Sequence, residues 1–398
     1  MRFQKKHQIR ILFLIGLIIY GCVEPFDFEE EVQEQEGVLV VEARLTNELK
    51  KHEILLSRST RLNDNALRKG EAAAIVKIID DQQNEYIFEE VSLGKYVSTV
   101  EFSAVSNRYY KLSITTSDAS KYLSNPMTLT AEAQIDKVYL SRTTDDNGVD
   151  GTGIFIDGYN PDGTSVFYKY EYEETYKIVA RLWGRQEAVI DRDAQGNPVG
   201  VSLVTKTREE EVCYVTRESN EIIIKSTNDL SEDRLVGVPL RFIERGHHSA
   251  TYRYSILAKQ YVQSREAYTF YETLKKFSSA DSDLFSQIQP GFFEGNIFLE
   301  NNSNEKVIGF FDVSSVSSKR IYFNYQDVFP DDATSLYVVD CSGENMVYSE
   351  GERLYQAIES GDKLYSYNPF SETYEMTRKE CGDCTVFGSN IVPDFWED

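Results

Sequence analysis

Five cysteines are the residues of this sequence whose chemistry can be read most directly. One of them, Cys22, follows Ile19-Tyr20-Gly21, and the tetrad resembles a lipobox, where a leader is cut and the cysteine becomes the lipidated first residue. Gly21 is the small residue that such a cleavage site requires, whereas Tyr20 is bulky for its place. The alternative is an ordinary signal peptide beside an unrelated cysteine. We predict that Cys22 is lipidated.

The leader before Cys22 has the layout of a signal peptide. Four basic residues precede the apolar run 11–19, which is too short to cross a bilayer as a helix. We therefore predict a lipoprotein signal peptide over residues 1–21. Residues 22–36 are predicted to form the lipidated cysteine and an acidic, extended tether.

The other four cysteines, Cys213, Cys341, Cys381 and Cys384, form an even set in a chain predicted to be exported. Such a set favours disulfides, because exported proteins fold in an oxidising compartment. A bridge between Cys381 and Cys384 would close a very short loop and constrain the unfolded chain little, so we expect each to bond a distant partner. The alternatives are a four-thiolate zinc site and a redox pair at Cys381–Cys384. We predict no metal and no other cofactor.

The charge of the chain limits its partners. Acidic residues outnumber basic ones by 65 to 42, and removal of the four basic leader residues leaves a balance of −27. A surface of this charge repels nucleic-acid phosphates and anionic lipid headgroups. The composition argues against a nucleic-acid-binding protein, and it predicts that a partner surface is apolar or basic.

Short runs of alternating or β-branched residues, separated by turn-like clusters, predict a mainly β chain. Residues 37–131 favour an immunoglobulin-like or transthyretin-like β-sandwich. Residues 132–398 are predicted to form a larger β-rich C-terminal domain with one or two short helices. One helix is expected near 264–277, where an apolar stripe recurs at helical spacing, and a shorter one over 352–360, ended by Gly361.

A Gly/Asp-rich loop partly matches a calcium-binding template. Asp146, Asp150, Gly151 and Asp157 fall at its first, fifth, sixth and twelfth positions. The third position is Gly148, which has no side-chain oxygen. The pattern therefore favours a hairpin turn, and calcium bound by the three aspartates is the alternative.

Aromatic residues are the other candidates for a binding surface. Strict alternation over 167–173 places three tyrosines on one face of a strand, where they either stack on a ligand or pack inside a sheet. The aromatic candidates for contact with a partner are Tyr168, Tyr170, Tyr172, Phe292, Phe293, Phe395 and Trp396.

Catalytic signatures are missing from the sequence. It contains no His-Glu-x-x-His, no Gly-x-Ser-x-Gly and no phosphate-binding Gly-rich loop. After the leader there are three histidines, and the adjacent pair His247-His248 favours a turn over joint metal ligation. We predict that the protein is not an enzyme, and a surface hydrolase is the alternative.

Several segments taken together resemble a known family. They are 213–214, 252–261, 289–297, 307–311, 314–321, 381–389 and 393–396. In combination they resemble a family of Bacteroidota outer-membrane lipoproteins that is catalogued as a domain of unknown function. The resemblance covers essentially the whole mature chain and carries no catalytic residues with it.

The resemblance implies a lipid-anchored protein of the outer membrane, on the cell surface, often encoded beside a SusC-like TonB-dependent transporter. The acidic stretch after Cys22 is similar to the surface-export signal of Bacteroidota lipoproteins. We therefore expect a binding or accessory subunit of a TonB-dependent nutrient-uptake system. The alternative partner is another envelope protein complex, in which the chain would be a structural subunit of an outer-membrane assembly or secretion machine.

Overall fold

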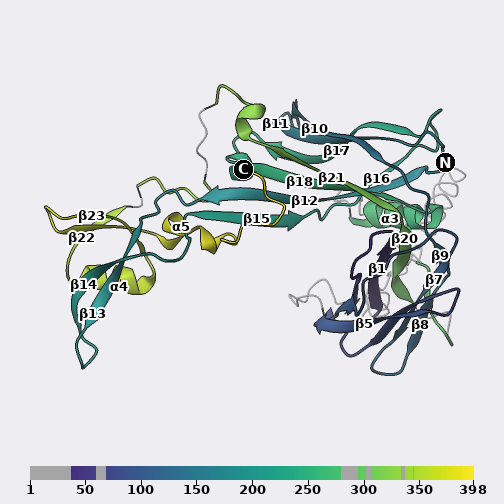
Figure 1. Ribbon diagram of the computed structural model, residues 1–398, viewed down its shortest axis with the longest axis horizontal. Coiled ribbons are helices and arrows are strands. Elements are labelled where there is room, and N and C mark those ends of the chain that lie inside the picture. The colour runs from purple at the N-terminus through teal and green to yellow at the C-terminus, as the bar shows by residue number, and fades with distance from the viewer. Residues whose placement is uncertain (1–36, 60–68, 279–294, 302–305, 333–336, 344) are drawn as a thin grey trace, which may run out of the picture.

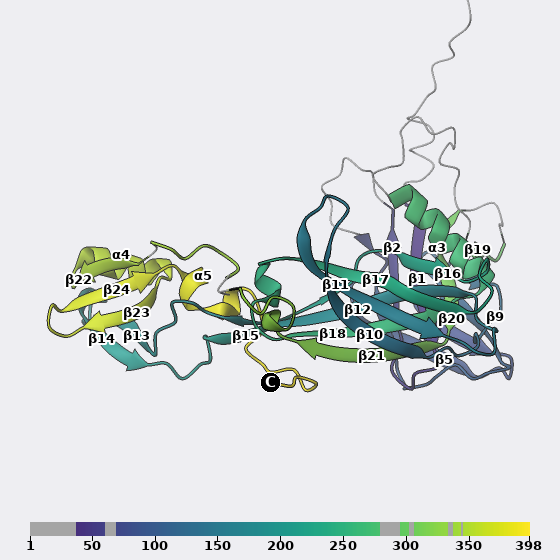
Figure 2. The same ribbon diagram turned by 90° about the horizontal axis from the view of Figure 1, so that it is seen from above.

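The structure is a computed structural model that describes residues 37–59, 69–278, 295–301, 306–332, 337–343 and 345–398. It is an elongated molecule of three lobes: an N-terminal sandwich, a central sandwich and a small distal lobe (Figures 1 and 2). The mainly β fold class predicted from the sequence is confirmed. Cys22, the tether, Phe292 and Phe293 lie outside the described residues. No helix in the described ranges is long and apolar enough to span a membrane.

The N-terminal sandwich is built from one curved 11-stranded sheet. Its strands alternate buried apolar and exposed polar residues, as in β1, so the apolar side chains of opposite walls meet in one core. The strands are β1 (Leu39–Thr46), β2 (Glu53–Arg58), β3 (Lys69–Gly70), β4 (Ile75–Asp80), β5 (Glu85–Ser92), β6 (Lys95–Ser98), β7 (Tyr109–Thr115), β8 (Lys121–Ser124), β9 (Met127–Thr128), β19 (Ile297–Leu299) and β20 (Val307–Ser314).

The last two strands of this sheet come from far along the chain. β20 pairs in parallel with β1 along its whole length, and β19 pairs with β8 at the opposite end of the sheet. The side chain of Asn296 joins these ends, because its amide donates to the backbone oxygen of Phe311 at 2.9 Å and accepts from its N–H at 2.7 Å. The lobe expected from 37–131 is thus completed by β19 and β20, a long-range pairing that local alternation does not reveal.

The central sandwich packs two sheets over a shared apolar core. Both sheets are antiparallel, and inward side chains from each supply that core. One sheet contains β10 (Ile135–Thr144), β11 (Asp150–Tyr159) and β17 (Arg234–Glu244); the other contains β12 (Phe167–Val179), β15 (Val212–Glu218), β16 (Ile223–Ser226), β18 (Tyr254–Val262) and β21 (Val316–Phe323). The 3-10 turn η1 (His248–Ala250) lies between β17 and β18, and a second, η2 (Tyr325–Asp327), follows β21.

Helix α3 (Arg265–Ser278) confirms the helix expected near 264–277. Ser264 caps its start by accepting from the N–H of Ala267 at 3.1 Å. The apolar face of α3 packs on Phe310 of β20, so the helix bridges the N-terminal and central sandwiches.

A partly buried ion pair joins the same two lobes. Arg44 of β1 donates two hydrogen bonds to the carboxylate of Glu171 on β12, at 3.0 and 2.9 Å, and Lys169 donates to it at 2.8 Å. Burial alone would raise the pKa of the Glu171 carboxyl, but the charges of Arg44 and Lys169 outweigh it and hold the pKa well below its usual range. The pair therefore stays charged and fixes the angle between the two lobes.

The distal lobe has its own small core and is assembled from two separate segments. The second helix expected from the sequence is α4, which ends at Gly361 in a left-handed conformation with φ of 96°. The elements are the hairpin β13 (Gln186–Arg192) and β14 (Pro198–Thr205), the sheet β22 (Met346–Ser349), β23 (Lys363–Asn368) and β24 (Thr373–Thr377), and α4 (Glu352–Ser360).

Candidate interaction surface

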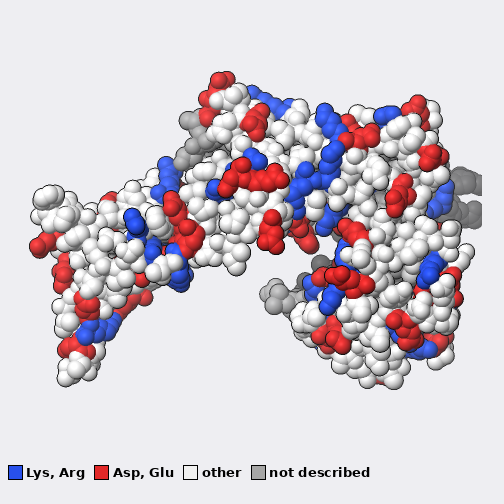
Figure 3. Space-filling model, viewed as in Figure 1, with Lys and Arg blue, Asp and Glu red and all other residues white. Residues whose placement is uncertain are grey.

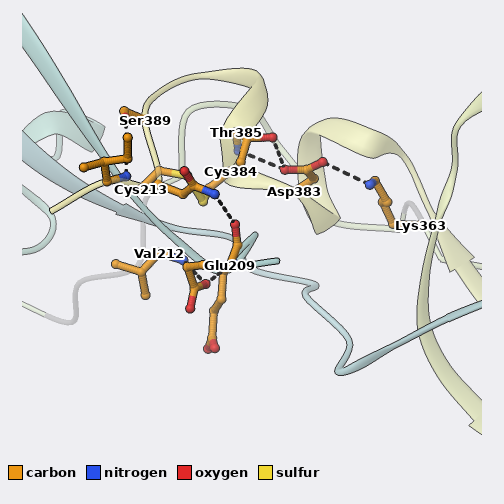
Figure 4. Close-up of a disulfide and its surroundings, with 11 residues drawn as sticks. Glu209, Val212, Cys213, Lys363, Asp383, Cys384, Thr385 and Ser389 are labelled. Carbon is orange, nitrogen blue, oxygen red and sulfur yellow. Dashed lines mark hydrogen bonds and ion pairs between the residues drawn. A yellow bond between two sulfur atoms is a disulfide. The ribbon is translucent and has the colours of Figure 1, made fainter. Parts of the chain in front are cut away.

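The distal lobe is fastened to the central sandwich by two disulfides. Cys213 of β15 bonds Cys384 of η3 (Cys384–Val386), and Cys341 bonds Cys381 of α5 (Lys379–Gly382). Figure 4 shows the first bridge, where the backbone N–H of Cys384 also donates to the carbonyl of Glu210 at 2.9 Å. Cys381 and Cys384 each take a distant partner, as expected from the sequence, so neither the zinc site nor the redox pair is formed.

A cluster of ion pairs supports this joint from both sides. Lys206, which follows β14, lies 3.1 Å from Glu210, and both side chains are buried. Lys363, at the start of β23, lies 3.3 Å from Glu210 and 3.0 Å from Asp383. Burial would raise the pKa of Asp383, but hydrogen bonds from Thr385 and Lys363 lower it below its ordinary value. The distal lobe is therefore held in a defined orientation.

Strand β14 gives the distal lobe an open, uncharged edge. Its sequence, Pro-Val-Gly-Val-Ser-Leu-Val-Thr, has no charged residue, and its exposed valines include Val199 and Val204, with exposed fractions of 61% and 44%. Within the described ranges, β14 pairs with β13 and with no other strand. Open edge strands usually carry charges, prolines or bulges that stop another strand from pairing. An edge that lacks them can accept a strand from a partner.

An aromatic side chain lies at the far tip of the same lobe. Phe370 is 99% exposed in the turn between β23 and β24, and this turn forms the end of the molecule farthest from the N-terminal sandwich (Figure 2). The turn is ordered by Asn368, whose side chain accepts from the N–H groups of Phe370 and Ser371 at 3.0 and 3.4 Å. The neighbouring strand β22 adds exposed Met346 and Val347. Such a group of exposed apolar side chains is typical of a contact surface.

Charged side chains occur over the whole visible face. Figure 3 shows lysine, arginine and acidic side chains on the N-terminal sandwich and on the distal lobe, with uncharged surface between them. The same view shows the outline hollowed below the central sandwich, between these two lobes. The distal lobe therefore projects as a separate surface.

The aromatic residues proposed from the sequence lie elsewhere. Tyr168, Tyr170 and Tyr172 are buried in the core of the central sandwich, so their role as a contact surface is wrong and the alternative, packing inside a sheet, is correct. The alternation does place the three tyrosines on one face of β12, but it does not show whether another sheet covers that face. Phe395 and Trp396 are half-buried in the C-terminal tail, against Arg320 and Tyr214 respectively.

The calcium alternative is also contradicted. Asp150 and Asp157 lie at opposite ends of β11, seven residues apart, which separates them by about 20 Å in an extended strand. Asp150 instead pairs with Arg142 at 2.7 Å and Arg245 at 3.2 Å. Asp157 accepts from the N–H of Gly237, and the loop with Asp146 is the turn of the β10–β11 hairpin.

Several other buried or half-buried titratable groups have structural partners. Glu174 accepts from Arg241 at 2.9 Å and from the hydroxyl of Tyr254. His247 caps the turn η1, as the sequence suggested for this pair, and burial together with the charge of His247 lowers the pKa of His248 to about 4. In the part of the chain that the structure describes, no three or more potential ligands gather where they could hold a metal ion.

Sequence reasoning did not single out β14 as a surface. The residues 201–205 are typical of a strand, but the pairing partners of a strand depend on tertiary structure, so the sequence does not distinguish an edge strand from a central one. The available signal was the twelve-residue uncharged run 194–205 in a chain with 27% charged residues.

Comparisons with known proteins identify a family but no activity. A family model described as "Domain of unknown function (DUF4249)" matches residues 23–320. No curated protein matches the chain. A pullulanase complexed with maltotriose, from Anoxybacillus sp. LM18-11, is 16% identical, with 56% of this chain and 24% of that chain covered and a TM-score of 0.15.

A second solved structure, trypsin-activated alpha-2-macroglobulin from Escherichia coli, is 9% identical, with 58% of this chain and 15% of that chain covered and a TM-score of 0.17. The chain thus spans about a quarter or less of either protein. Similarities at this level carry no argument about fold or function.

Proposed function

This chain belongs to the family described as "Domain of unknown function (DUF4249)", and from that premise we propose that it is an outer-membrane lipoprotein acting by association. Lipid on Cys22 anchors it, on the cell surface of a Bacteroidota species. Its partner is a SusC-like TonB-dependent transporter, for which it serves as a binding or accessory subunit in nutrient uptake.

The sequence around Cys22 supports the anchor. The family match begins at residue 23, directly after the cysteine that the lipobox would make the first residue of the mature protein. The 14 residues from 23 to 36 reach at most about 50 Å when fully extended. A tether of this length allows the body to lean over a neighbouring barrel and raises its effective concentration there, so a low-affinity docking surface suffices.

The observation that carries the association proposal is the distal lobe. The described chain begins with β1 in the N-terminal sandwich, so the tether joins the body at the end opposite the distal lobe (Figure 1). The distal lobe, held in place by two disulfides, then presents the open β14 edge and exposed Phe370 away from the anchored end. The exposed, uncharged β14 edge and the exposed apolar side chain of Phe370 are the properties expected of a docking surface.

The anchor is tested by Cys22→Ala. The variant should be released from the membrane fraction, while the wild type stays with the outer membrane through detergent-free washing. A variant that still fractionates with the outer membrane as the wild type does rules out the lipid anchor.

The partner is tested by affinity purification of the tagged full-length protein in mild detergent, followed by quantitative mass spectrometry. A TonB-dependent transporter recovered in near-equal amount supports the proposal. Recovery of assembly or secretion machinery supports the structural-subunit alternative, and a partner-free protein that cleaves glycans or peptides supports the hydrolase alternative.

A further inference from the structure

We propose that the open edge of β14 accepts a β-strand from the partner protein, and that this strand alternates apolar and basic residues. The inference deepens the proposed function, on which it rests for the existence of a protein partner. It assigns the surface through which the association occurs and the chemistry of the segment that docks there.

The backbone of β14 has hydrogen-bonding groups directed to the open edge. The N–H of Lys206 donates to the carbonyl of Arg185, so these residues form a hydrogen-bonded pair of the antiparallel hairpin. Hydrogen-bonded and non-hydrogen-bonded pairs alternate along such a ladder. Val201, Leu203 and Thr205 therefore belong to non-hydrogen-bonded pairs, and their N–H and C=O groups point away from β13. These three alternate residues provide the free backbone donors and acceptors with which an added strand would form its hydrogen bonds.

Two other edge strands of the described chain, β15 and β17, are covered or interrupted. Ser389 of the C-terminal tail pairs with Tyr214 of edge strand β15 through two backbone hydrogen bonds. Edge strand β17 contains Pro239, and two register shifts bend it against β11. The only proline of β14 is its first residue, Pro198, and the one irregularity of the hairpin lies beside it. From Gly200 to Thr205, no strand of the described residues pairs with this edge, and it contains neither a proline nor a bulge.

The two faces of the edge select the side chains of the added strand. On one face, Val201 and Leu203 pack into the distal core, so adjacent residues of the partner strand would extend an apolar surface. On the other face, Ser202 donates to the carboxylate of Asp191 at 2.7 Å. A Cβ placed on Gly200 would lie 3.6 Å from Oε1 of Glu350 and 3.7 Å from Oδ2 of Asp191. These two exposed carboxylates favour lysine or arginine at the adjacent position of the partner.

Charge argues for such a partner and against a second copy of this chain. Pairing of β14 with β14 of another copy would bring two pairs of carboxylates, Asp191 and Glu350, close together. The mature chains also carry −27 each. Like charges facing one another across an interface disfavour association, whereas a basic strand is attracted.

The test uses the full-length lipoprotein in detergent micelles and a fluorescein-labelled eight-residue peptide of alternating valine and lysine. Two variants disturb the edge: Val204→Lys repels the basic strand, and Thr205→Pro removes an N–H that points to the open edge without disturbing the pairing with β13. The matched control is Val189→Lys, on the same face of the neighbouring strand and 40% exposed, against 44% for Val204. Unchanged thermal unfolding confirms that each variant is folded.

We expect the wild type and Val189→Lys to bind the peptide equally by fluorescence anisotropy, within about twofold, and both edge variants to bind at least tenfold more weakly. Equal binding by all four proteins overturns the proposal, because general attraction to an acidic protein would not distinguish them. Equal binding of a valine–glutamate peptide also overturns it. A dimer by light scattering that Thr205→Pro abolishes assigns the edge to a second copy instead.

Affinity purification with the same variants separates this inference from the proposed function. If the transporter is recovered equally with wild type and both edge variants, strand addition at β14 is wrong and the proposed function stands. If the peptide binds at β14 but no transporter is recovered with the wild type, the proposed function is wrong, whereas strand addition at β14 is supported.

Discussion

The N-terminal sandwich and the distal lobe are both built from short β-strands, but the edges of their sheets differ. The N-terminal sheet closes its ends with β19, β20 and the side chain of Asn296. In the distal lobe, no strand of the described chain pairs with the outer side of the uncharged β14. A closed sheet is suited to a supporting body, and an open uncharged edge is suited to contact with another chain.

The two lobes are also attached to the central sandwich by different means. Non-covalent contacts join the N-terminal sandwich: helix α3 and the partly buried pair of Arg44 and Glu171. Two disulfides join the distal lobe, whose own core is small. Because a small core supplies little stability, covalent links are the effective way to hold such a lobe in a fixed orientation.

The largest expected effect comes from breaking the non-covalent attachment. Glu171→Leu removes the carboxylate shared by Arg44 and Lys169, and leaves Arg44 with the longer contact to Asp312 at 3.5 Å. The loss should lower the free energy of unfolding by about 3–4 kcal/mol, because the side chain of Lys169 is buried and loses its counter-charge. Chemical denaturation measures the loss. The control Glu85→Gln removes an exposed partner of Lys77 and should cost less than about 1 kcal/mol. If both variants lower the free energy of unfolding by the same small amount, the ion pair of Arg44 and Glu171 does not stabilise the contact between the two lobes.

Removal of a disulfide should act on the other lobe. Replacing both Cys213 and Cys384 by serine should cost about 2–4 kcal/mol, since the bridge links residues 171 positions apart in the chain. Hydrogen–deuterium exchange should speed up in β13, β14 and β22–β24 and stay unchanged in β1–β8. Uniform loss of protection over the whole chain would contradict the assignment of the bridge to the distal lobe.

Opening the closed sheet is expected to have a smaller effect. Asn296→Ala removes two buried hydrogen bonds with Phe311 and should cost about 2 kcal/mol. Faster exchange should appear at β19 and β20. The comparison variant Asn147→Ala, in an exposed turn, should change stability by less than about 0.5 kcal/mol. If both variants unfold alike, Asn296 is not the link between the two ends.

The smallest expected effect is a dependence of stability on pH, which should be weakest in the distal lobe. Burial lowers the pKa of His52, His247 and His248 in the folded chain, and that of His248 to about 4. Protonation therefore favours the unfolded state, and stability should be complete above about pH 6.5 and fall towards pH 4.

We expect a loss of about 1 kcal/mol from buried His52 and half-buried His247 and His248, measured by urea unfolding at pH 7.5 and 4.5. His248→Gln should flatten the dependence. No histidine occurs in 186–205 or 346–377, so exchange in the distal lobe should change least. A larger loss of exchange protection at acidic pH in the distal lobe than in the two sandwiches would contradict this expectation.

Features set by neighbouring residues were predictable from the sequence. The helices α3 and α4 follow from apolar spacing, the capping residue Ser264 and the terminating Gly361. The expectation of distant partners for Cys381 and Cys384 followed from loop length, but the identity of each partner depends on the folded arrangement.

Features set by long-range packing were not predictable. The pairing of β20 with β1 joins residues more than 260 positions apart, and nothing in either strand specifies the other. The burial of Tyr170 depends on the second sheet of the central sandwich. The exposure of β14 depends on the absence of a neighbouring strand in the described lobe, which no local pattern encodes.

The central claim, that the distal edge and not the N-terminal sandwich meets the partner, is tested most directly by photo-cross-linking in living cells. A photoreactive amino acid is placed either at Val199 beside the open edge or at Ile87 on the outer face of the N-terminal sandwich, which have exposed fractions of 61% and 51%. We predict cross-linked adducts with a TonB-dependent transporter from position 199 and none from position 87. Adducts from Ile87 alone, or equal adducts from both positions, would contradict it.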